Sequence, residues 1–497
     1  MNHLLPLLVA VPLLGAIVPF VLGARYPRLA VRATAAVLLA QVGIAVAVVA
    51  AVAASGPQTY VLGGLPAAVG IGLLVDQVSG IFVVLVAVAG AVLYLTVRED
   101  ATGPGDSLWL LLVAGLTGVV VTADVFNLYV FLEISGLAAY GLVASRRGGT
   151  AALAALHYLL VGTVGATFYL LGVGYAYVAT GTLAMADLQP ALASVGYDSP
   201  LVLTSFVFVT LGLAVKLALF PVHAWKPDAY AGSAHDVAAL LATLGSTVAG
   251  YALVRVVFGV FTAEFLAAVP LVQTALLAAG VVSVAAGGYL TLRQSNLRRL
   301  LSYSSILQFG LVLVGLSLAT AAAVTGALVL LVGNAVAKGG LFVATGLFER
   351  ELEAVTVADL AGKAREAPVT AAAVALAFTS LVGLPPTAGF AGKWYVTLAA
   401  VDSGRWVVAT VVVLSTLVSL AYAGRVVERL YLADGDGEAG AGHAVADGGQ
   451  PADARFVPGL ESRAVAVVVL AALATLVLGL GSTALADWVA PVVEVWL

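Results

Sequence analysis

Four ionisable side chains interrupt long apolar stretches of this sequence. Lys216, Lys338 and Lys393 are three of its five lysines, and Glu133 stands in the middle of FNLYVFLEISGLAAYGLVA. The 17 arginines, in contrast, lie almost entirely at the edges of such stretches. Lysine can lose its proton when it is removed from water, whereas arginine stays protonated. Lysines combined with a glutamate therefore predict a site that takes up and releases protons; a static ion pair between helices is the alternative for any single lysine.

Prolines interrupt two of the same stretches, in VKLALFPVHAW and GLPPTAGFAGKW. Pro221 follows Lys216, and the pair Pro385 and Pro386 precedes Lys393. A proline lacks an N–H and leaves the carbonyl four residues earlier without its helical partner. The carbonyls released in this way belong to Leu217, Leu381 and Val382. At membrane depth such groups are tolerated only where they are buried in protein or face a hydrated cavity, so both breaks indicate a functional interior.

Three further polar residues are placed to assist proton transfer. Asn334 lies four residues before Lys338, so both share one helix face and can share a partner or a water molecule. His157 stands near the start of an apolar stretch, and imidazole groups titrate near neutral pH. His223 lies beside the break at Pro221. Packing explains Asn334 equally well, and a fixed interfacial histidine explains His157 equally well.

The elements that must position these residues are membrane-spanning helices. Of the 497 residues, 62% are hydrophobic and only 10% are charged, whereas about 25% of the residues in a soluble domain are charged. Apolar runs of about 20 residues, long enough to cross a membrane as helices, recur along the chain. We therefore predict an all-α polytopic membrane protein with about 14 spans. Their expected ranges are 4–23, 29–54, 70–97, 107–123, 125–145, 152–179, 200–231, 236–258, 265–291, 299–318, 322–347, 367–400, 405–432 and 462–491.

The two proline-interrupted spans, 200–231 and 367–400, stand five helices apart. Because five is odd, two successive sets of five helices run in opposite directions through the membrane. Transporters with paired discontinuous helices are built from inverted repeats of this kind. We expect two inverted five-helix repeats, each with a broken helix. The expected units are 1–106 (the first three helices), 107–260 (the first repeat), 261–432 (the second repeat), 433–460 (a flexible loop) and 461–497 (the last helix).

Basic residues orient these spans. Of the 22 lysines and arginines, 17 fall in or beside alternate connections, and Lys226 is counted among them. The positive-inside rule places these connections in the cytoplasm. This predicts a multi-pass protein of the plasma membrane with both termini outside the cytoplasm. The segment from Ala433 to Phe456 is rich in Gly, Ala and Asp without apolar periodicity, which predicts a flexible cytoplasmic loop.

The sequence lacks the residues or motifs that several kinds of catalytic and cofactor-binding sites require. The chain has no cysteine, which excludes disulfides, thiolate metal sites and iron–sulfur ligation. It has no P-loop, no HExxH, no nucleotide-binding glycine motif and no paired in-membrane histidines for haem. It also lacks a basic patch for nucleic acid. We expect no cofactor and no metal, and a transport subunit rather than an enzyme that acts by itself.

Four segments resemble the proton-conducting antiporter-like subunits of multisubunit membrane complexes. They are DVFNLYVFLEISGLAAYGLVAS, KLALFPVHAWKPDAY, LRRLLSYSSILQFG and GLPPTAGFAGKW. That family includes the large membrane subunits of respiratory complex I and of membrane-bound hydrogenases, and the A and D subunits of Mrp-type cation/proton antiporters. The resemblance extends from about the third to the thirteenth span, and the phrase around Glu133 is most similar to the Mrp D subunit.

The resemblance implies roles for the matching residues. Glu133 corresponds to an essential glutamate and Lys216 to its lysine partner. Lys338 corresponds to a central relay position and Lys393 to the lysine at the exit. In the eighth span, where the family usually has a further lysine, this chain has Thr247 in LATLGSTVAGYAL. This departure leaves the continuity of the proton path open.

We expect on this basis a proton-translocating, D-subunit-like component of a multisubunit Na⁺(cation)/H⁺ antiporter. One alternative is the antiporter-like proton-pumping subunit of a complex I-type NADH/quinone oxidoreductase or of a membrane-bound hydrogenase, in which the chain would be part of a translocase. Another, suggested by Thr247, is a scaffold that conducts nothing. The expected partners are other membrane subunits, protons, Na⁺ and the lipid bilayer.

Overall fold

Apolar runs without helix breakers fold as helices, and helices make up nearly all of this chain. A computed structural model describes residues 4–64, 70–98, 102–146, 148–433 and 460–497. The helices in this part of the chain are α1 (Leu4–Gly15), α2 (Ile17–Leu22), α3 (Pro27–Ser55), α4 (Gln77–Val97), α5 (Gly103–Val121), α6 (Val125–Ala144), α7 (Gly149–Thr180), α8 (Met185–Val195), α9 (Pro200–Leu217), α10 (Trp225–Gly232), α11 (His235–Leu240), α12 (Ser246–Val256), α13 (Thr262–Ala268), α14 (Pro270–Arg293), α15 (Leu297–Leu316), α16 (Ala321–Leu352), α17 (Pro368–Val382), α18 (Ala388–Asp402), α19 (Trp406–Tyr431), α20 (Leu460–Leu480) and α21 (Ser482–Trp496). Two short strands, β1 (Gln58–Val61) and β2 (Gly72–Val75), complete them.

The predicted number of spans is confirmed. In the described residues, 13 helices or continuous helix groups are long and apolar enough to cross a membrane. One group joins α1 and α2, and another joins α11 to α13 over His235–Ala268. The remaining crossing consists of α17 and α18, each of 15 residues and too short to span alone. The chain is therefore a polytopic helical membrane protein.

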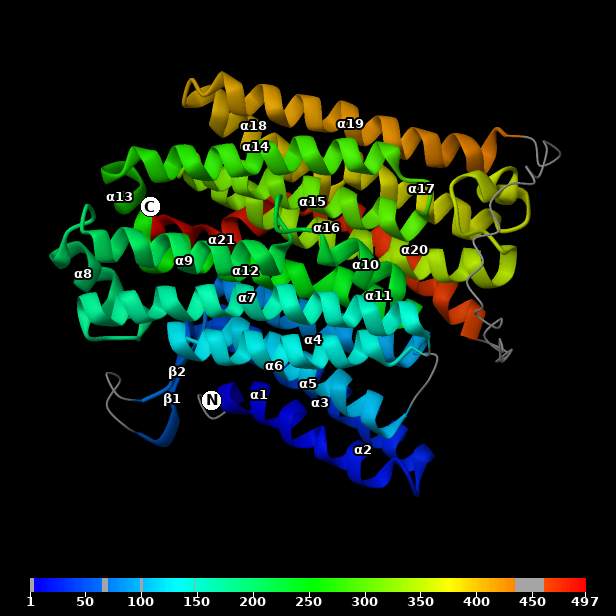
Figure 1. Cartoon of the computed structure of the whole chain (residues 1–497), viewed down its shortest axis with the longest axis horizontal. Helices are drawn as coiled ribbons and strands as arrows, with labels where there is room; N and C mark the ends of the chain where they lie inside the picture. The colour runs from blue at the N-terminus through cyan, green and yellow to red at the C-terminus, as the bar shows by residue number, and fades with distance from the viewer. Residues whose placement is uncertain (1–3, 65–69, 99–101, 147, 434–459) are drawn as a thin grey trace.

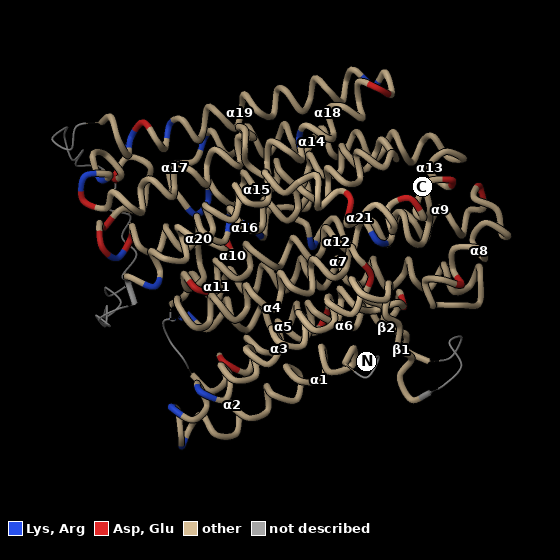
Figure 2. The backbone as a smooth tube through the Cα atoms, turned by 180° about the vertical axis from the view of Figure 1, so that it is seen from behind, with Lys and Arg blue, Asp and Glu red and all other residues tan. Residues whose placement is uncertain are grey.

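The helices lie side by side in one bundle (Figure 1). The most buried spans among the described residues are α16 and the group α11 to α13, because 94% of the apolar window of each is buried, whereas 33% of the window in α3 is buried. Both marked termini lie at the same end of the bundle (Figure 1), as an even number of crossings requires. Lysines and arginines gather at the opposite end (Figure 2).

Both predicted helix breaks are present. The first span of this kind consists of α9, which ends at Leu217, and α10, which begins at Trp225. The second consists of α17, which ends at Val382, and α18, which begins at Ala388. One break lies in the set from α5 to α13 and the other in the set from α14 to α19. Each of the two inverted five-helix sets therefore contains one interrupted span.

The structure differs from the sequence-based expectation at the ends of several spans. The predicted span 70–97 begins as a helix only at Gln77, because residues 72–75 pair with residues 58–61 as an antiparallel hairpin. A short apolar strand has the same composition as the first turn of an apolar helix. The additional helix α8 lies between two spans and was not predicted. The expected loop 433–460 lies outside the described residues except at its two ends.

Candidate functional site

Glu133 of α6 and Lys216 of α9 form an ion pair inside the bundle. The Lys216 Nζ lies 3.2 Å from the Glu133 Oε1 and also donates to the Tyr140 hydroxyl at 3.3 Å. The side chain of Lys216 is 10% exposed and that of Glu133 is 20% exposed. The carboxylate offsets part of the cost of removing the ammonium from water. The structure thus brings together the two residues for which the sequence predicted a partnership.

Lys216 occupies the last turn of α9, next to the break. The helix ends because Ala218 turns into the left-handed region, with a φ of 61°, before Pro221 is reached. Two carbonyls of the final turn accept side-chain hydrogen bonds, and that of Val215 also accepts from the backbone N–H of Ala218 at 3.0 Å. The indole of Trp225 donates to the Val215 carbonyl at 3.0 Å, and the Ser246 hydroxyl donates to the Lys216 carbonyl at 3.3 Å. The sequence predicted a released carbonyl at Leu217. The carbonyls that accept side-chain donors at this break are those of the two preceding residues, Val215 and Lys216.

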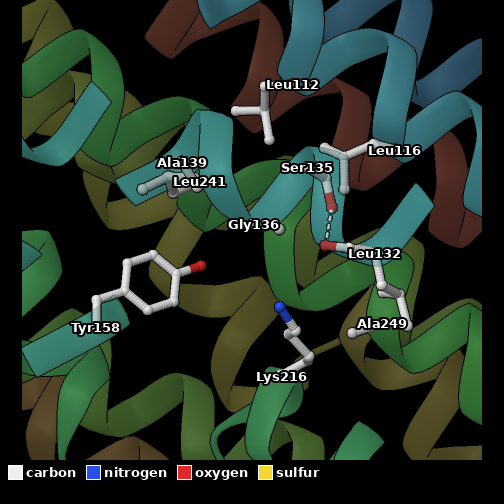
Figure 3. A pocket seen from close by; sticks show the side chains of 11 residues that line it. Leu112, Leu116, Leu132, Ser135, Gly136, Ala139, Tyr158, Lys216, Leu241 and Ala249 are labelled. Atoms are coloured by element: carbon white, nitrogen blue, oxygen red, sulfur yellow. Dashed lines mark hydrogen bonds between the residues drawn. The ribbon is translucent and has the colours of Figure 1, made fainter. Parts of the chain in front are cut away.

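A small cavity of about 20 Å³ adjoins this ion pair, large enough for a water molecule. Most of its lining is apolar, and the polar side chains among its lining residues are those of Lys216, Tyr158 and Ser135. The ammonium of Lys216 and the hydroxyl of Tyr158 both point into it (Figure 3). The ring of Tyr158 is fixed by stacking on Trp225, with centroids 4.1 Å apart. Lys216 therefore faces a carboxylate on one side and a space for water on the other.

Lys338 lies at the centre of α16 and is fully buried. Its ammonium donates to the Leu301 carbonyl at 2.7 Å and to the Ser304 hydroxyl, both on α15. The side-chain amide of Asn334, one turn earlier, is buried and has no hydrogen-bond partner among the described residues. Because buried polar groups are almost always hydrogen-bonded, this amide is a natural place for ordered water beside Lys338.

Lys393 of α18 satisfies one of the carbonyls released at the second break. Its ammonium donates to the Val382 carbonyl at 2.8 Å and to the Thr416 hydroxyl at 3.2 Å. The other released carbonyl, that of Leu381, accepts from the Gln308 side chain at 2.9 Å. The break that contains Pro385 and Pro386 therefore leaves both carbonyls exposed to side chains, as the sequence predicted.

The two histidines of the sequence prediction are not among the residues that line the cavity beside Lys216. His157 pairs with Asp228 at 3.4 Å, and both side chains are 38% exposed. On α7 it is the next residue, Tyr158, that faces the cavity. The ring of His223 lies beside the first break, near Phe220 and Tyr303.

Sequence reasoning missed the fourth buried lysine. Lys226 is 1% exposed and donates to the Ser246 hydroxyl at 2.8 Å. It was assigned to a cytoplasmic connection because it follows an apolar run and a proline. The signal that would have placed it correctly is its distance of only five residues from Pro221, too few to leave the membrane. Sequence reasoning also missed a second internal ion pair, between Asp76 and Arg255 at 2.5 Å.

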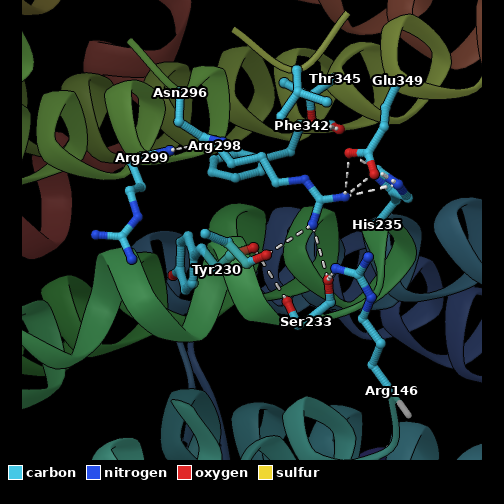
Figure 4. Close-up of polar contacts among 12 residues, drawn as sticks. Arg146, Tyr230, Ser233, His235, Asn296, Arg298, Arg299, Phe342, Thr345 and Glu349 are labelled. Carbon is cyan, nitrogen blue, oxygen red and sulfur yellow. Dashed lines mark hydrogen bonds and ion pairs between the residues drawn. The ribbon is translucent and has the colours of Figure 1, made fainter. Parts of the chain in front are cut away.

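The far end of α10 is held by arginines (Figure 4). Arg298 donates to the carbonyls of Ser233 and Ala231, at 2.9 and 3.3 Å, and Arg146 donates to Ser233 at 3.4 Å. Arg298 also pairs with Glu349 of α16 at 3.2 Å and contacts the ring of His235. Cations near a helix C-terminus stabilise its last carbonyls. This cluster therefore anchors the second half of the broken helix to α15 and α16.

Together these contacts form a row of ionisable groups through the interior. Glu133 pairs with Lys216, and Ser246 touches both the Lys216 carbonyl and Lys226. Beyond Lys338, Gln308 lies one turn along α15 from Ser304 and reaches the second break, where Lys393 is bound. Within the described residues, no group of three or more His, Cys, Asp or Glu side chains is placed to hold a metal ion. Such a row is suited to proton transfer rather than to covalent chemistry.

Comparison with known proteins finds a matching family and several similar relatives. Residues 122–419 match a family described as NADH:quinone oxidoreductase/Mrp antiporter, TM. The chain is 40% identical over 452 residues to the N subunit of the NADH-quinone oxidoreductase of Desulforudis audaxviator, covering 86% of this chain and 87% of that protein. It is 29% identical over 429 residues to the D subunit of the Na(+)/H(+) antiporter of Bacillus subtilis, covering 84% and 85%.

A solved structure shares the whole fold. It is a chain of the membrane-bound sulfane sulfur reductase, an archaeal respiratory membrane complex, with a TM-score of 0.87 and 27% identity. The match covers 100% of this chain and 98% of that one. The fold described above therefore also occurs in a chain of a respiratory membrane complex.

Proposed function

This chain belongs to the NADH:quinone oxidoreductase/Mrp antiporter membrane family, and from that premise we propose that it is the N-subunit-like, proton-pumping component of a complex I-type oxidoreductase. As a member of this family it is an antiporter-like, proton-translocating membrane subunit of a multisubunit assembly. The finer assignment, to a redox-driven complex, is our proposal. In such a complex the redox chemistry takes place on other subunits, and this chain moves protons.

The observation that carries the proposal is the buried pair of Glu133 and Lys216, which opens a row of buried lysines. When the carboxylate is close, it favours the charged ammonium of Lys216; when it withdraws, desolvation favours release of the proton. Motion of the pair then sends a proton toward Lys338 and Lys393. A purely structural ion pair would not need the lysines that follow.

Sequence similarity favours the redox-driven complex over the antiporter. The N-subunit relative is 40% identical to this chain, and the antiporter D-subunit relative is 29% identical over a similar length. The expectation of a D-like subunit, which came from the phrase around Glu133, is therefore not confirmed. Exchange of Na⁺ by an Mrp-like complex remains the second candidate, on the strength of the antiporter relative.

Purification in mild detergent followed by mass spectrometry of the co-purifying subunits separates these candidates. We expect subunits that carry iron–sulfur clusters or flavin. Small membrane proteins like those of Mrp complexes, without redox subunits, would instead assign the chain to an antiporter.

Proton movement is tested in inside-out membrane vesicles that contain the intact complex. We expect NADH to acidify the vesicle interior, and Glu133→Gln to remove the contribution of this chain while subunit levels stay unchanged. Loss of an existing pH difference when Na⁺ is added, because protons leave the vesicle in exchange for Na⁺, without acidification by NADH, would support the antiporter. Unchanged proton movement in Glu133→Gln would support the third alternative, a scaffold that conducts nothing.

A further inference from the structure

Lys226 is a buried lysine with no carboxylate partner among the residues that the structure describes. Its side chain is 1% exposed, and its ammonium lies 4.5 Å from the centre of the Phe309 ring and 5.5 Å from that of Tyr230. Its hydrogen bond goes to the neutral hydroxyl of Ser246, at 2.8 Å. None of the ion pairs found among the described residues includes it. An ammonium that is held only by a hydroxyl and two rings is poorly compensated for its desolvation, and lysine can respond by losing its proton.

The position of Lys226 connects two of the predicted relay residues. Its hydroxyl partner, Ser246, donates to the backbone carbonyl of Lys216 at 3.3 Å. The Phe309 ring that it contacts belongs to α15, the helix that also provides the hydrogen-bond acceptors of Lys338. Lys226 therefore lies between the first break and the centre of the bundle.

The neighbouring span offers no other proton carrier in this region. Between residues 237 and 254, the span formed by α11 to α13 contains no charged side chain, and Arg255 is already paired with Asp76. The hydroxyl of Thr247 is buried and has no partner in the part of the chain that the structure describes. Gly250 packs on Leu331 and Gly339 on Thr243, so this stretch of the span runs along the part of α16 that bears Lys338.

We propose that Lys226 carries the proton between Lys216 and Lys338, taking the place of a lysine on α12. The proposal rests on the proposed proton-pumping function. In the first step an N–H bond of the Lys216 ammonium breaks and an N–H bond forms on the neutral amine of Lys226, through water or the Ser246 hydroxyl. In the second step the same proton leaves Lys226 and binds the neutral amine of Lys338. No electron pair or heavy atom is exchanged with a co-reactant.

The test uses the intact complex in inside-out vesicles, with NADH-driven acidification as the readout and subunit levels checked by blotting. Lys226→Met removes the carrier, and we expect transport to fall to the level of Glu133→Gln. Lys226→Arg keeps the charge but cannot release its proton, so we expect an equal loss. Lys363→Arg is the matched control, because Lys363 forms a surface pair with Glu366, and we expect it to transport normally.

A relocated lysine gives the decisive comparison. We expect the double variant Lys226→Met with Thr247→Lys to recover a large part of the transport that Lys226→Met alone has lost, because the amine is restored to the same region from α12. Equal subunit levels in the single and double variants, measured by blotting, would show that the recovery is one of transport and not of assembly.

Normal transport in Lys226→Arg would overturn the proposal, because it would make Lys226 a fixed cation. So would a loss in Lys226→Met that Thr247→Lys does not relieve. Both results leave the proposed function standing as long as Glu133→Gln removes the contribution of this chain to transport by the same vesicles. Absence of NADH-driven transport in the wild type, with or without Lys226, would overturn the proposed function and this inference together.

Discussion

The ammonium of Lys393 donates a hydrogen bond to the carbonyl of Val382, 2.8 Å away, across the gap between α17 and α18. A side chain from the second half of the broken span thus replaces the backbone donor that Pro386 cannot supply. The same ammonium contacts Thr416 of α19. Lys393 is therefore both a structural partner of the break and the last buried amine in the row.

These two roles of Lys393 can be separated by substitution. We expect Lys393→Arg to assemble normally, since a guanidinium can also donate to the Val382 carbonyl, and yet to lose proton transport because it stays protonated. Lys393→Ala should lose transport as well. The measurement is acidification of inside-out vesicles at equal subunit levels. Normal transport by Lys393→Arg would show that the residue serves only the break.

Glu133 and Lys216 should behave as one unit. We expect Glu133→Ala and Lys216→Ala each to abolish coupled transport while the complex still assembles. The double variant should be no worse than either single variant, because residues that act together have non-additive effects. Vesicle acidification and blotting of the subunits test this. Wild-type activity in either single variant contradicts the switch, and loss of assembly in both would make the pair a purely structural one.

The orientation in the membrane can be tested at the two ends of one broken span. Glu366 and Ser403 are both exposed, before α17 and after α18 respectively. The chain has no cysteine, so single cysteines can be labelled selectively with an impermeant reagent. By the positive-inside rule, we expect Ser403→Cys to react in intact cells and Glu366→Cys to react only in inside-out vesicles. The reverse pattern would place both termini in the cytoplasm.

Packing at the second break depends on a glycine. A Cβ atom on Gly389 would lie 1.7 Å from the Ser380 carbonyl oxygen, so α17 and α18 could not approach as they do. We expect Gly389→Ala to lower the thermal stability of the purified complex and to reduce its level in membranes. The matched control is Gly424→Ala on α19, where a Cβ would meet no atom within 4 Å. Equal stability of the two variants would show that the break tolerates a wider separation.

Much of the site was predictable because ionisable residues and prolines inside apolar runs have few possible roles. A lysine and a glutamate in the middle of apolar runs have few roles, and the partnership of Glu133 with Lys216 followed from that scarcity. Likewise, the geometry of proline fixed which carbonyls would be released, and Leu381 and Val382 both accept side-chain donors.

Other features of the site could not be predicted, because composition shows neither how deep a residue lies in the membrane nor which face of its helix it occupies. In the sequence analysis, Lys226 was counted with the basic residues of the cytoplasmic connections. In fact residues 218–224 leave the helix, and α10 restarts within the bundle. The sequence could not say which face of α7 carries His157: consecutive residues point about 100° apart around a helix, and it is Tyr158 that lines the cavity. A role of His157 in proton transfer stays a prediction.

The short helix α10 joins two chemically different surroundings. Lys226 lies in its first turn, among buried groups, while its last carbonyls are held by Arg298 and Arg146 at the basic end of the bundle. A helix of eight residues is about 12 Å long, so these two surroundings lie only that far apart. Side chains of other elements hold α10 at both ends, Ser246 at one and the two arginines at the other. A shift of this half of the broken span would therefore have to break a contact at the buried end, at the basic end, or at both.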